Sequence, residues 1–149
     1  MSTFWDRVAG LYGLVEHSNS AVNTAAARVA QLVPAGAKVL DCAAGTGLFS
    51  LAAAERAGSV LCTDQSEAML RQARKKAARK GLKNVSFAQR DIAALPDPDG
   101  SFDVVIAANV LHLLGAPEAA ARELWRVTAP GGRLVLPTYL QGKVGAACG

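Results

Sequence analysis

The chain has 149 residues and a formal net charge of +4, with 51% hydrophobic and 19% charged residues. A chain of this length and composition can bury its own core, which excludes a disordered or fibrous protein and favours one domain. Its three cysteines form no CxxC pair and are too sparse for a disulfide framework or a zinc site. We therefore expect buried free thiols, no metal centre and a cytoplasmic protein.

No segment of the sequence is typical of a membrane span or a secretory signal. The longest uncharged apolar stretch, from Val104 to Pro117, is too short to cross a bilayer. The N-terminal residues lack the basic front and the long apolar middle of a signal peptide. We therefore expect neither a span nor secretion.

Helical and strand-like segments alternate along the chain. A helical N-terminal segment is expected over residues 1–36, where Pro34 and Gly36 end the last helix. Apolar segments then predict five strands, at residues 38–43, 59–63, 85–90, 102–108 and 133–140. Intervening segments predict helices at residues 48–57, 66–80 and 118–128. This alternation predicts an α/β fold in a single domain, with a parallel sheet, helices on both faces and a ligand-binding core over residues 37–141.

Polar residues lie at the ends of four predicted strands. Asp41, Asp64 and Asp91 close the first three strands, and Asn109 follows the fourth. Ligands of open parallel sheets bind beyond the carboxyl ends of the strands. These four side chains are therefore predicted to line one binding edge.

The turn from Asp41 to Gly47 favours one nucleotide cofactor over another. Its glycines, Gly45 and Gly47, let a ligand approach the backbone closely. The turn matches the dinucleotide pattern GxGxxG only in part, because Ser50 stands at the third glycine. The carboxylate of Asp41 would repel a pyrophosphate, whereas S-adenosylmethionine carries a sulfonium, an ammonium and no phosphate. An NAD-dependent oxidoreductase is therefore the disfavoured alternative.

Two further acids favour a nucleoside ligand. At the end of the second strand, Asp64 is placed to accept hydrogen bonds from both ribose hydroxyls. Asp91 can accept from the exocyclic amine of adenine, while Ile92 and Met69 offer apolar faces to the ring. Ordinary core packing remains an alternative for Met69, and a turn cap remains one for Asp91.

Five segments resemble, in order, the motifs of class I S-adenosylmethionine-dependent methyltransferases. The first reads Val-Leu-Asp-Cys-Ala-Ala-Gly-Thr-Gly, and the set lies at residues 39–47, 62–70, 90–96, 101–109 and 126–134. The resemblance implies a Rossmann-like sheet in strand order 3-2-1-4-5 and S-adenosylmethionine as the cofactor. It also implies methyl transfer to a small-molecule acceptor by direct displacement.

The resemblance also indicates which residues hold the cofactor. Ala43 stands where many members have the first glycine of the motif, a departure that resembles the quinone-methylating branch. The segment from Phe4 to Tyr12 resembles the N-terminal lid of that branch, so Tyr12 and Trp5 are lid candidates, with anchoring of the helix as the alternative. The full expected set of cofactor-binding residues is Tyr12, Asp41, Ala43, Gly45, Gly47, Asp64, Gln65, Met69, Asp91, Ile92 and Asn109.

The C-terminal end departs from the family pattern. The family sheet normally continues past the fifth strand with a helix and an antiparallel pair of strands, and because this sequence ends at Gly149 we expect the sixth and seventh strands to be absent. The fifth strand would then be an exposed apolar edge, which invites pairing. Either a truncated chain or a homodimer through that edge is expected.

Direct displacement needs a general base only when the acceptor is protonated. His112 is a weak candidate for that base, because a histidine in an apolar run is more often structural. The sequence Asn109-Val-Leu-His112 differs from the Asn/Asp-Pro-Pro-Tyr/Phe pattern of nucleic-acid amine methylation, which argues against a nucleic-acid substrate. A non-catalytic module that binds S-adenosylmethionine stays open as an alternative.

A run of basic residues extends from Arg71 to Lys83. Contact with nucleic acid or an acidic membrane is possible for such a run. No aromatic residues interleave with these charges as in single-strand binders, so the simpler interpretation is a solvated helix face.

Overall fold

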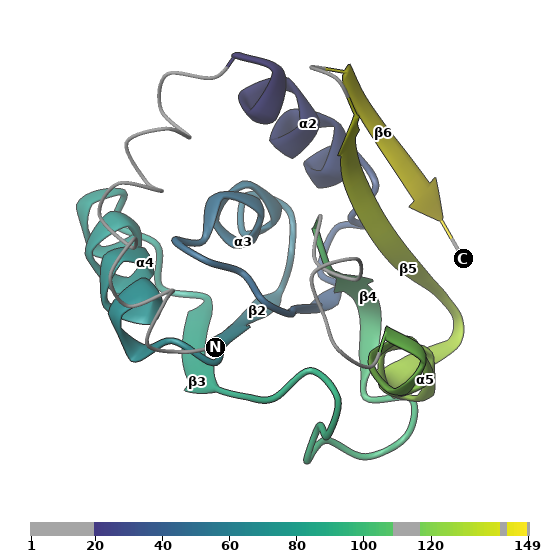
Figure 1. The fold of residues 1–149 in the computed structure, drawn as a ribbon. Helices are drawn as coiled ribbons and strands as arrows, with labels where there is room; N and C mark the ends of the chain where they lie inside the picture. Colours follow the sequence, from purple (N-terminus) through teal and green to yellow (C-terminus); the bar gives the residue numbers. More distant parts are fainter. Residues whose placement is uncertain (1–19, 109–116, 141–142, 149) are drawn as a thin grey trace.

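Strands and helices alternate along the chain as the sequence predicts, and the chain ends in an antiparallel strand pair (Figure 1). The computed structural model describes residues 20–108, 117–140 and 143–148. Its helices are α2 (Ser20–Gln31), α3 (Leu48–Ala53), α4 (Glu67–Arg79) and α5 (Pro117–Val127). Its strands are β1 (Lys38–Asp41), β2 (Ser59–Asp64), β3 (Val85–Gln89), β4 (Phe102–Ile106), β5 (Thr128–Leu140) and β6 (Lys143–Cys148). Among the described residues, none of the helices combines the length and the hydropathy that a membrane span requires.

The first five strands form a parallel sheet in the order 3-2-1-4-5, which confirms the predicted fold class. In its centre β1 pairs with both β2 and β4, so that Val39 lies between Val60 and Val104. Because all five strands run the same way, their carboxyl ends meet at one edge of the sheet.

A sixth strand corrects the expectation for the C-terminus. β6 pairs antiparallel with β5, from Leu140 opposite Lys143 to Val135 opposite Cys148. This register leaves two residues between the paired ends, and a two-residue connection is enough to join antiparallel strands. The prediction that no sixth strand exists is therefore wrong. The prediction that β5 forms an exposed edge is wrong for the same reason. The homodimer was expected because the β5 edge would be exposed, and this reason no longer holds.

Alternating residues of the strands supply two apolar layers. On one face, Val39, Val60 and Val104 pack with α2 and α3, and α4 packs beside them on β2 and β3. On the other face, Leu40 and Val105 pack with α5 and with the segment 91–100. Both faces of the sheet are thus covered, which explains why its strands are apolar without strict alternation.

Helix α4 forms as its sequence predicts. The hydroxyl of Ser66 accepts a hydrogen bond from the Met69 backbone N–H at 3.2 Å, so Ser66 caps the helix. The residues of its inner face are buried, namely Met69, Leu70, Ala73 and Ala77. Helix α3 ends at Ala53, earlier than predicted, and turns follow it at residues 54–56.

The junction between α5 and β5 contains a bulge. Phe102 pairs with Thr128, but Val104 pairs with Arg133, so extra residues of β5 lie opposite Asp103. Gly132 sits inside this bulge, where a Cβ would come within 2.7 Å of the Asp103 backbone oxygen. The close approach of two backbones therefore requires a residue without a side chain at this position.

We predict that Gly132→Ala lowers the free energy of unfolding by about 1–3 kcal/mol, because the methyl group overlaps backbone that cannot move aside. Urea unfolding followed by circular dichroism measures this. Gly131→Asn is the matched control, since Gly131 has φ +79° and open space around it, and asparagine tolerates that conformation. Equal stability of Gly132→Ala and the wild type would refute the steric account.

Candidate functional site

Three predicted acids lie at the carboxyl edge of the sheet. Asp41 and Asp64 are the last residues of β1 and β2, and Asp91 follows the end of β3. The strand register brings Asp41 opposite Cys62, while Asp64 pairs with Gln89. The structure thus brings these acids to neighbouring strand ends, as predicted. Tyr12, Asn109 and His112 lie outside the described residues.

The turn between β1 and α3 adopts a left-handed backbone at three positions. The φ angles are +52° at Ala43, +60° at Gly45 and +88° at Gly47. Gly47 caps α3, and a Cβ on it would lie 3.0 Å from the Cβ of Ala73 on α4. The glycine at position 47 therefore serves both the turn and the close packing of α4. Ala43 holds a conformation that favours glycine, which explains why a glycine is expected there.

Asp64 anchors this turn. One carboxylate oxygen accepts a hydrogen bond from the Gly45 N–H at 2.9 Å, and the other accepts from the Ser66 N–H at 2.8 Å. The side chain is 8% exposed. Each carboxylate oxygen has two lone pairs, so Asp64 retains capacity to accept hydrogen bonds from a ligand. A second contact joins the same elements, because Lys76 Nζ on α4 lies 3.1 Å from the Thr46 hydroxyl.

Asp41 lies beneath the turn rather than on its surface. Its side chain is 1% exposed, and one oxygen accepts a hydrogen bond from the Ser50 hydroxyl at 2.6 Å. Sequence reasoning treated Ser50 only as a missing glycine and did not predict this contact. The signal was present, because an acid in a buried strand needs a hydrogen-bond donor and Ser50 is a polar residue of a short apolar helix.

An open pocket of about 370 Å³ lies at the ends of β2 and β3, lined by Gln65, Gln89, Arg90 and Asp91. Gln65 and Asp91 were predicted from the sequence, whereas Gln89 and Arg90 were not. The Gln89 side-chain amide donates to the Gln65 carbonyl at 2.6 Å, and the Arg90 N–H donates to the Asp64 carbonyl at 3.0 Å. These contacts join the two strand ends that form the pocket.

The apolar residues expected beside an adenine pack in the interior. Met69 is 1% exposed and Ile92 is 6% exposed. Asp91 accepts a hydrogen bond from the Ala93 N–H at 2.9 Å, so it caps the turn that follows β3. The core-packing and turn-cap interpretations therefore describe this geometry, and contact of these three residues with a ligand stays a prediction.

Two thiols lie close to the turn, at Cys42 and Cys62, and both are buried and free. Burial raises the pKa of each thiol well above its usual range, and the charge of Asp41 adds to the effect. Both are therefore protonated and poor nucleophiles at neutral pH. Within the described ranges, no cluster of three or more metal-ligating side chains occurs.

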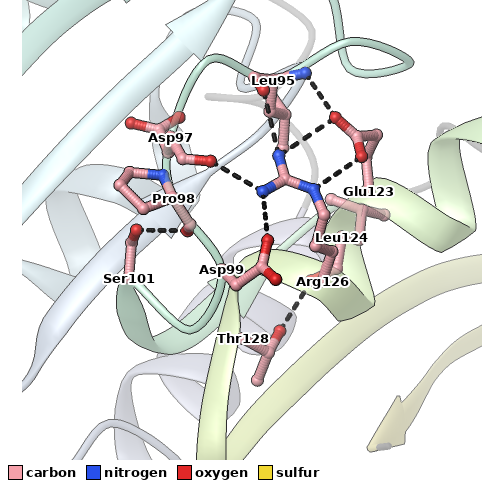
Figure 2. A network of polar contacts seen from close by, with 9 residues as sticks. All are labelled: Leu95, Asp97, Pro98, Asp99, Ser101, Glu123, Leu124, Arg126 and Thr128. Carbon is pink, nitrogen blue, oxygen red and sulfur yellow. Dashed lines mark hydrogen bonds and ion pairs between the residues drawn. The ribbon is translucent and has the colours of Figure 1, made fainter.

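Arg126 clamps the segment 91–100 to α5 (Figure 2). Its Nε and Nη2 donate to the Glu123 carboxylate at 2.8 and 3.2 Å, and Nη2 also donates to the Leu95 carbonyl at 3.0 Å. Its Nη1 donates to the Asp97 carbonyl and to the Asp99 carboxylate. The guanidinium thus uses all five N–H donors, which a lysine cannot reproduce. The clamp therefore holds residues 95–99, which follow the pocket residue Asp91 along the chain.

The contact between Arg126 and Glu123 also has an electrostatic contribution. Hydrogen bonds from Arg126 lower the pKa of Glu123 below its ordinary value of 4.5. Stability from this pair is therefore present above pH 4.5 and is lost as the pH falls through the pKa of Glu123 in the folded protein.

We predict that Arg126→Lys destabilises the protein at neutral pH, because lysine leaves carbonyl groups of the segment 91–100 without their donors. The difference from wild type should shrink as the pH falls from 4.5 through the lowered pKa of Glu123, because protonation removes the charge pair from the wild type. Urea unfolding across this pH range is the measurement. Arg122→Lys on the exposed side of α5 is the control, and equal stability losses in the two variants would contradict the clamp.

We also predict that Ala43→Gly stabilises the protein by roughly 0.5–1 kcal/mol, because it relieves the left-handed backbone at this position. Ala44→Gly provides the matched control, since Ala44 has no positive φ and should lose stability. Thermal unfolding of the wild type and the two variants measures these changes in stability. A loss of stability in both would show that Ala43 is not strained.

A glycine turn after the first strand of a parallel sheet, with an acid ending the second strand, defines a nucleoside-binding α/β domain. Comparison with known protein families agrees with this class and identifies a particular family within it. The family described as methyltransferase domain matches residues 39–132. That match covers more than half of the chain, so the chain belongs to this family of methyltransferase domains.

Three proteins illustrate the similarity. The demethylmenaquinone methyltransferase of Thermus thermophilus is 46% identical over 101 residues, which are 66% of this chain and 46% of that protein. The ubiquinone/menaquinone biosynthesis C-methyltransferase UbiE of Yersinia pestis is 42% identical over 106 residues, 68% of this chain and 42% of that protein. The crystal structure of a SAM-dependent methyltransferase from Aquifex aeolicus has a TM-score of 0.66 and 28% identity, and covers 72% of this chain and 58% of that one.

The chain spans less than half the length of these two curated relatives. The matched region lies within the part of the chain that carries the glycine turn, the acids and the Arg126 clamp.

Proposed function

We propose that this chain binds S-adenosylmethionine at the carboxyl edge of its sheet and transfers a methyl group to a small-molecule acceptor. The core that carries this activity is residues 37–141. The observation that carries the proposal is the position of Asp64. This residue ends β2 next to the pocket residue Gln65, and its carboxylate accepts a hydrogen bond from the Gly45 N–H of the glycine turn. Two of the relatives are named as a demethylmenaquinone methyltransferase and as a C-methyltransferase of ubiquinone/menaquinone biosynthesis, which favours a quinone-type acceptor for this chain.

The described residues fit such a cofactor by their chemistry. Asp64 has acceptor capacity for the ribose hydroxyls, and the pocket of Gln65 and Asp91 adjoins it on the adenine side. Gly45 lets a ligand approach the backbone closely. The buried carboxylate of Asp41, directly below the turn, favours a cationic amino-acid group over a pyrophosphate.

When bound, the cofactor supplies an electrophilic methyl group on a sulfonium. The chain's own part is to hold and orient it. Asp64 would hold the ribose, the glycine turn would hold the amino-acid end, and Gln65 and Asp91 would line the pocket beside them. Such positioning accounts for much of the catalysis of a displacement reaction. His112 remains a candidate base for an acceptor that must lose a proton.

We predict that Asp64→Asn weakens S-adenosylmethionine binding by roughly 10- to 150-fold, because it removes a charged acceptor of hydrogen bonds. Isothermal titration with S-adenosylmethionine, S-adenosylhomocysteine and NAD measures this. Asp103→Asn is the matched control, because the Asp103 carboxylate also accepts a backbone N–H, from Lys38, at the opposite edge of the sheet. Binding of NAD as tight as that of S-adenosylmethionine would contradict the proposal.

Transfer itself is tested with a radiolabelled methyl group and a panel of demethylated quinones. Labelled product that requires Asp64 supports the enzyme. Tight cofactor binding without product from any acceptor favours the alternative, a module that binds S-adenosylmethionine without turnover.

A further inference from the structure

The positive charge of the chain is concentrated on one helix. Residues 67–83 contain seven of the sixteen basic residues and one of the twelve acidic residues. The remainder has nine basic and eleven acidic residues, a net charge of −2. The net charge of +4 therefore comes entirely from α4 and the residues just after it.

The fold presents these cations together. The inner face of α4 is buried against β2 and β3, and α4 lies at the β3 end of the sheet, at the left of Figure 1. Six of the seven basic side chains are exposed: Arg71, Arg74, Lys75, Arg79, Lys80 and Lys83. We call these six residues the α4 basic face. The seventh, Lys76, is half-buried and contacts Thr46 instead.

Helix α4 has few acidic residues that could neutralise the positive charge of the α4 basic face. Its one acid, Glu67, pairs with Arg74 at 2.7 Å, and both side chains are 44% exposed, so water weakens the pair. Arg71, Lys75 and Arg79 recur every fourth residue and therefore form a row along one side of the helix. About 20 Å of helix thus carries a line of cations on a convex surface.

We propose that the α4 basic face docks the protein on an anionic phospholipid surface. Four to eight basic residues on an amphipathic helix suit such a surface, with each contributing about 1 kcal/mol near the membrane. The helix lies flat in this arrangement, because the cations are on its outer side along its length. It presents no large apolar side chain outward, so attraction is electrostatic and reversible.

The same cations suit a nucleic acid less well. Single-strand binders stack bases on exposed aromatic rings. Near the α4 basic face the ring of Phe87 is half-buried, and the guanidinium of Arg74 lies 5.4 Å from its centre. Among the described residues, Trp125 is the exposed large hydrophobic side chain, and it belongs to α5. A convex helix also lacks the groove that would follow a phosphate backbone.

The test is sedimentation of the full chain with lipid vesicles of phosphatidylcholine alone or with about 30% phosphatidylglycerol. We expect binding only to the anionic vesicles, and loss of binding when salt rises from about 0.05 M to about 0.5 M, as screening requires. The variant Lys75→Gln/Arg79→Gln/Lys80→Gln should bind at least about ten-fold more weakly.

The matched control removes the same charge elsewhere. Arg28→Gln/Arg56→Gln/Arg122→Gln changes exposed cations on other elements and should keep nearly full binding. The single variant Lys75→Gln should show a smaller loss in the same direction, which guards against misfolding of the triple variant. Equal losses in the two triple variants would overturn the proposal. Tighter binding to duplex DNA or RNA than to anionic vesicles, at the same salt, would also overturn it.

Discussion

The carboxylate of Asp64 connects the elements from which the site is built. One of its oxygens holds the glycine turn through the Gly45 N–H, and the other holds the start of α4 through the Ser66 N–H. The turn needs such an anchor, because its backbone is left-handed at three positions and each departs from the conformation that most residues prefer. A single charged acceptor at the end of β2 therefore fixes the relative position of two loops and one helix. Asp64 also directly precedes Gln65, a lining residue of the pocket in which a nucleoside is proposed to bind.

The segment that follows the pocket residue Asp91 depends on a second constraint. The segment between β3 and β4 contains no regular helix, and its path is fixed by the donors of Arg126 and the carboxylate of Glu123 (Figure 2). Ile92 and Leu95 of this segment also enter the core beneath the sheet. Side-chain hydrogen bonds to backbone carbonyls thus perform the task that backbone hydrogen bonds perform in a helix. The two constraints thus hold the segments that precede and follow the pocket-lining residues Gln89, Arg90 and Asp91 in the sheet and along the chain.

Much of this arrangement is predictable from the sequence. Apolar runs that end in polar residues predicted all five parallel strands, and the acids at their ends predicted the binding edge. These features are local, so periodicity and end signals are sufficient to find them. The cap at Ser66 and the inner face of α4 are local in the same sense.

What the sequence did not predict depends on contacts between distant segments. Arg126 meets Leu95 across 31 residues, and no local pattern indicates which basic residue of α5 turns inward. The glycine pattern marks Ser50 only as a mismatch, although its hydroxyl donates a hydrogen bond to Asp41. The family pattern, with a helix before its last strands, does not predict β6, because a strand of six residues pairs directly with β5 in antiparallel register.

The most direct test of the account is a nuclear magnetic resonance titration of the isotope-labelled chain with S-adenosylhomocysteine. The account predicts that the backbone amide signals of Gly45, Gln65 and Ile92 shift together, while those of Trp125 and Gly131, away from the pocket, stay in place. Shifts concentrated at Trp125 and Gly131, or no shifts at the carboxyl edge of the sheet, would contradict it.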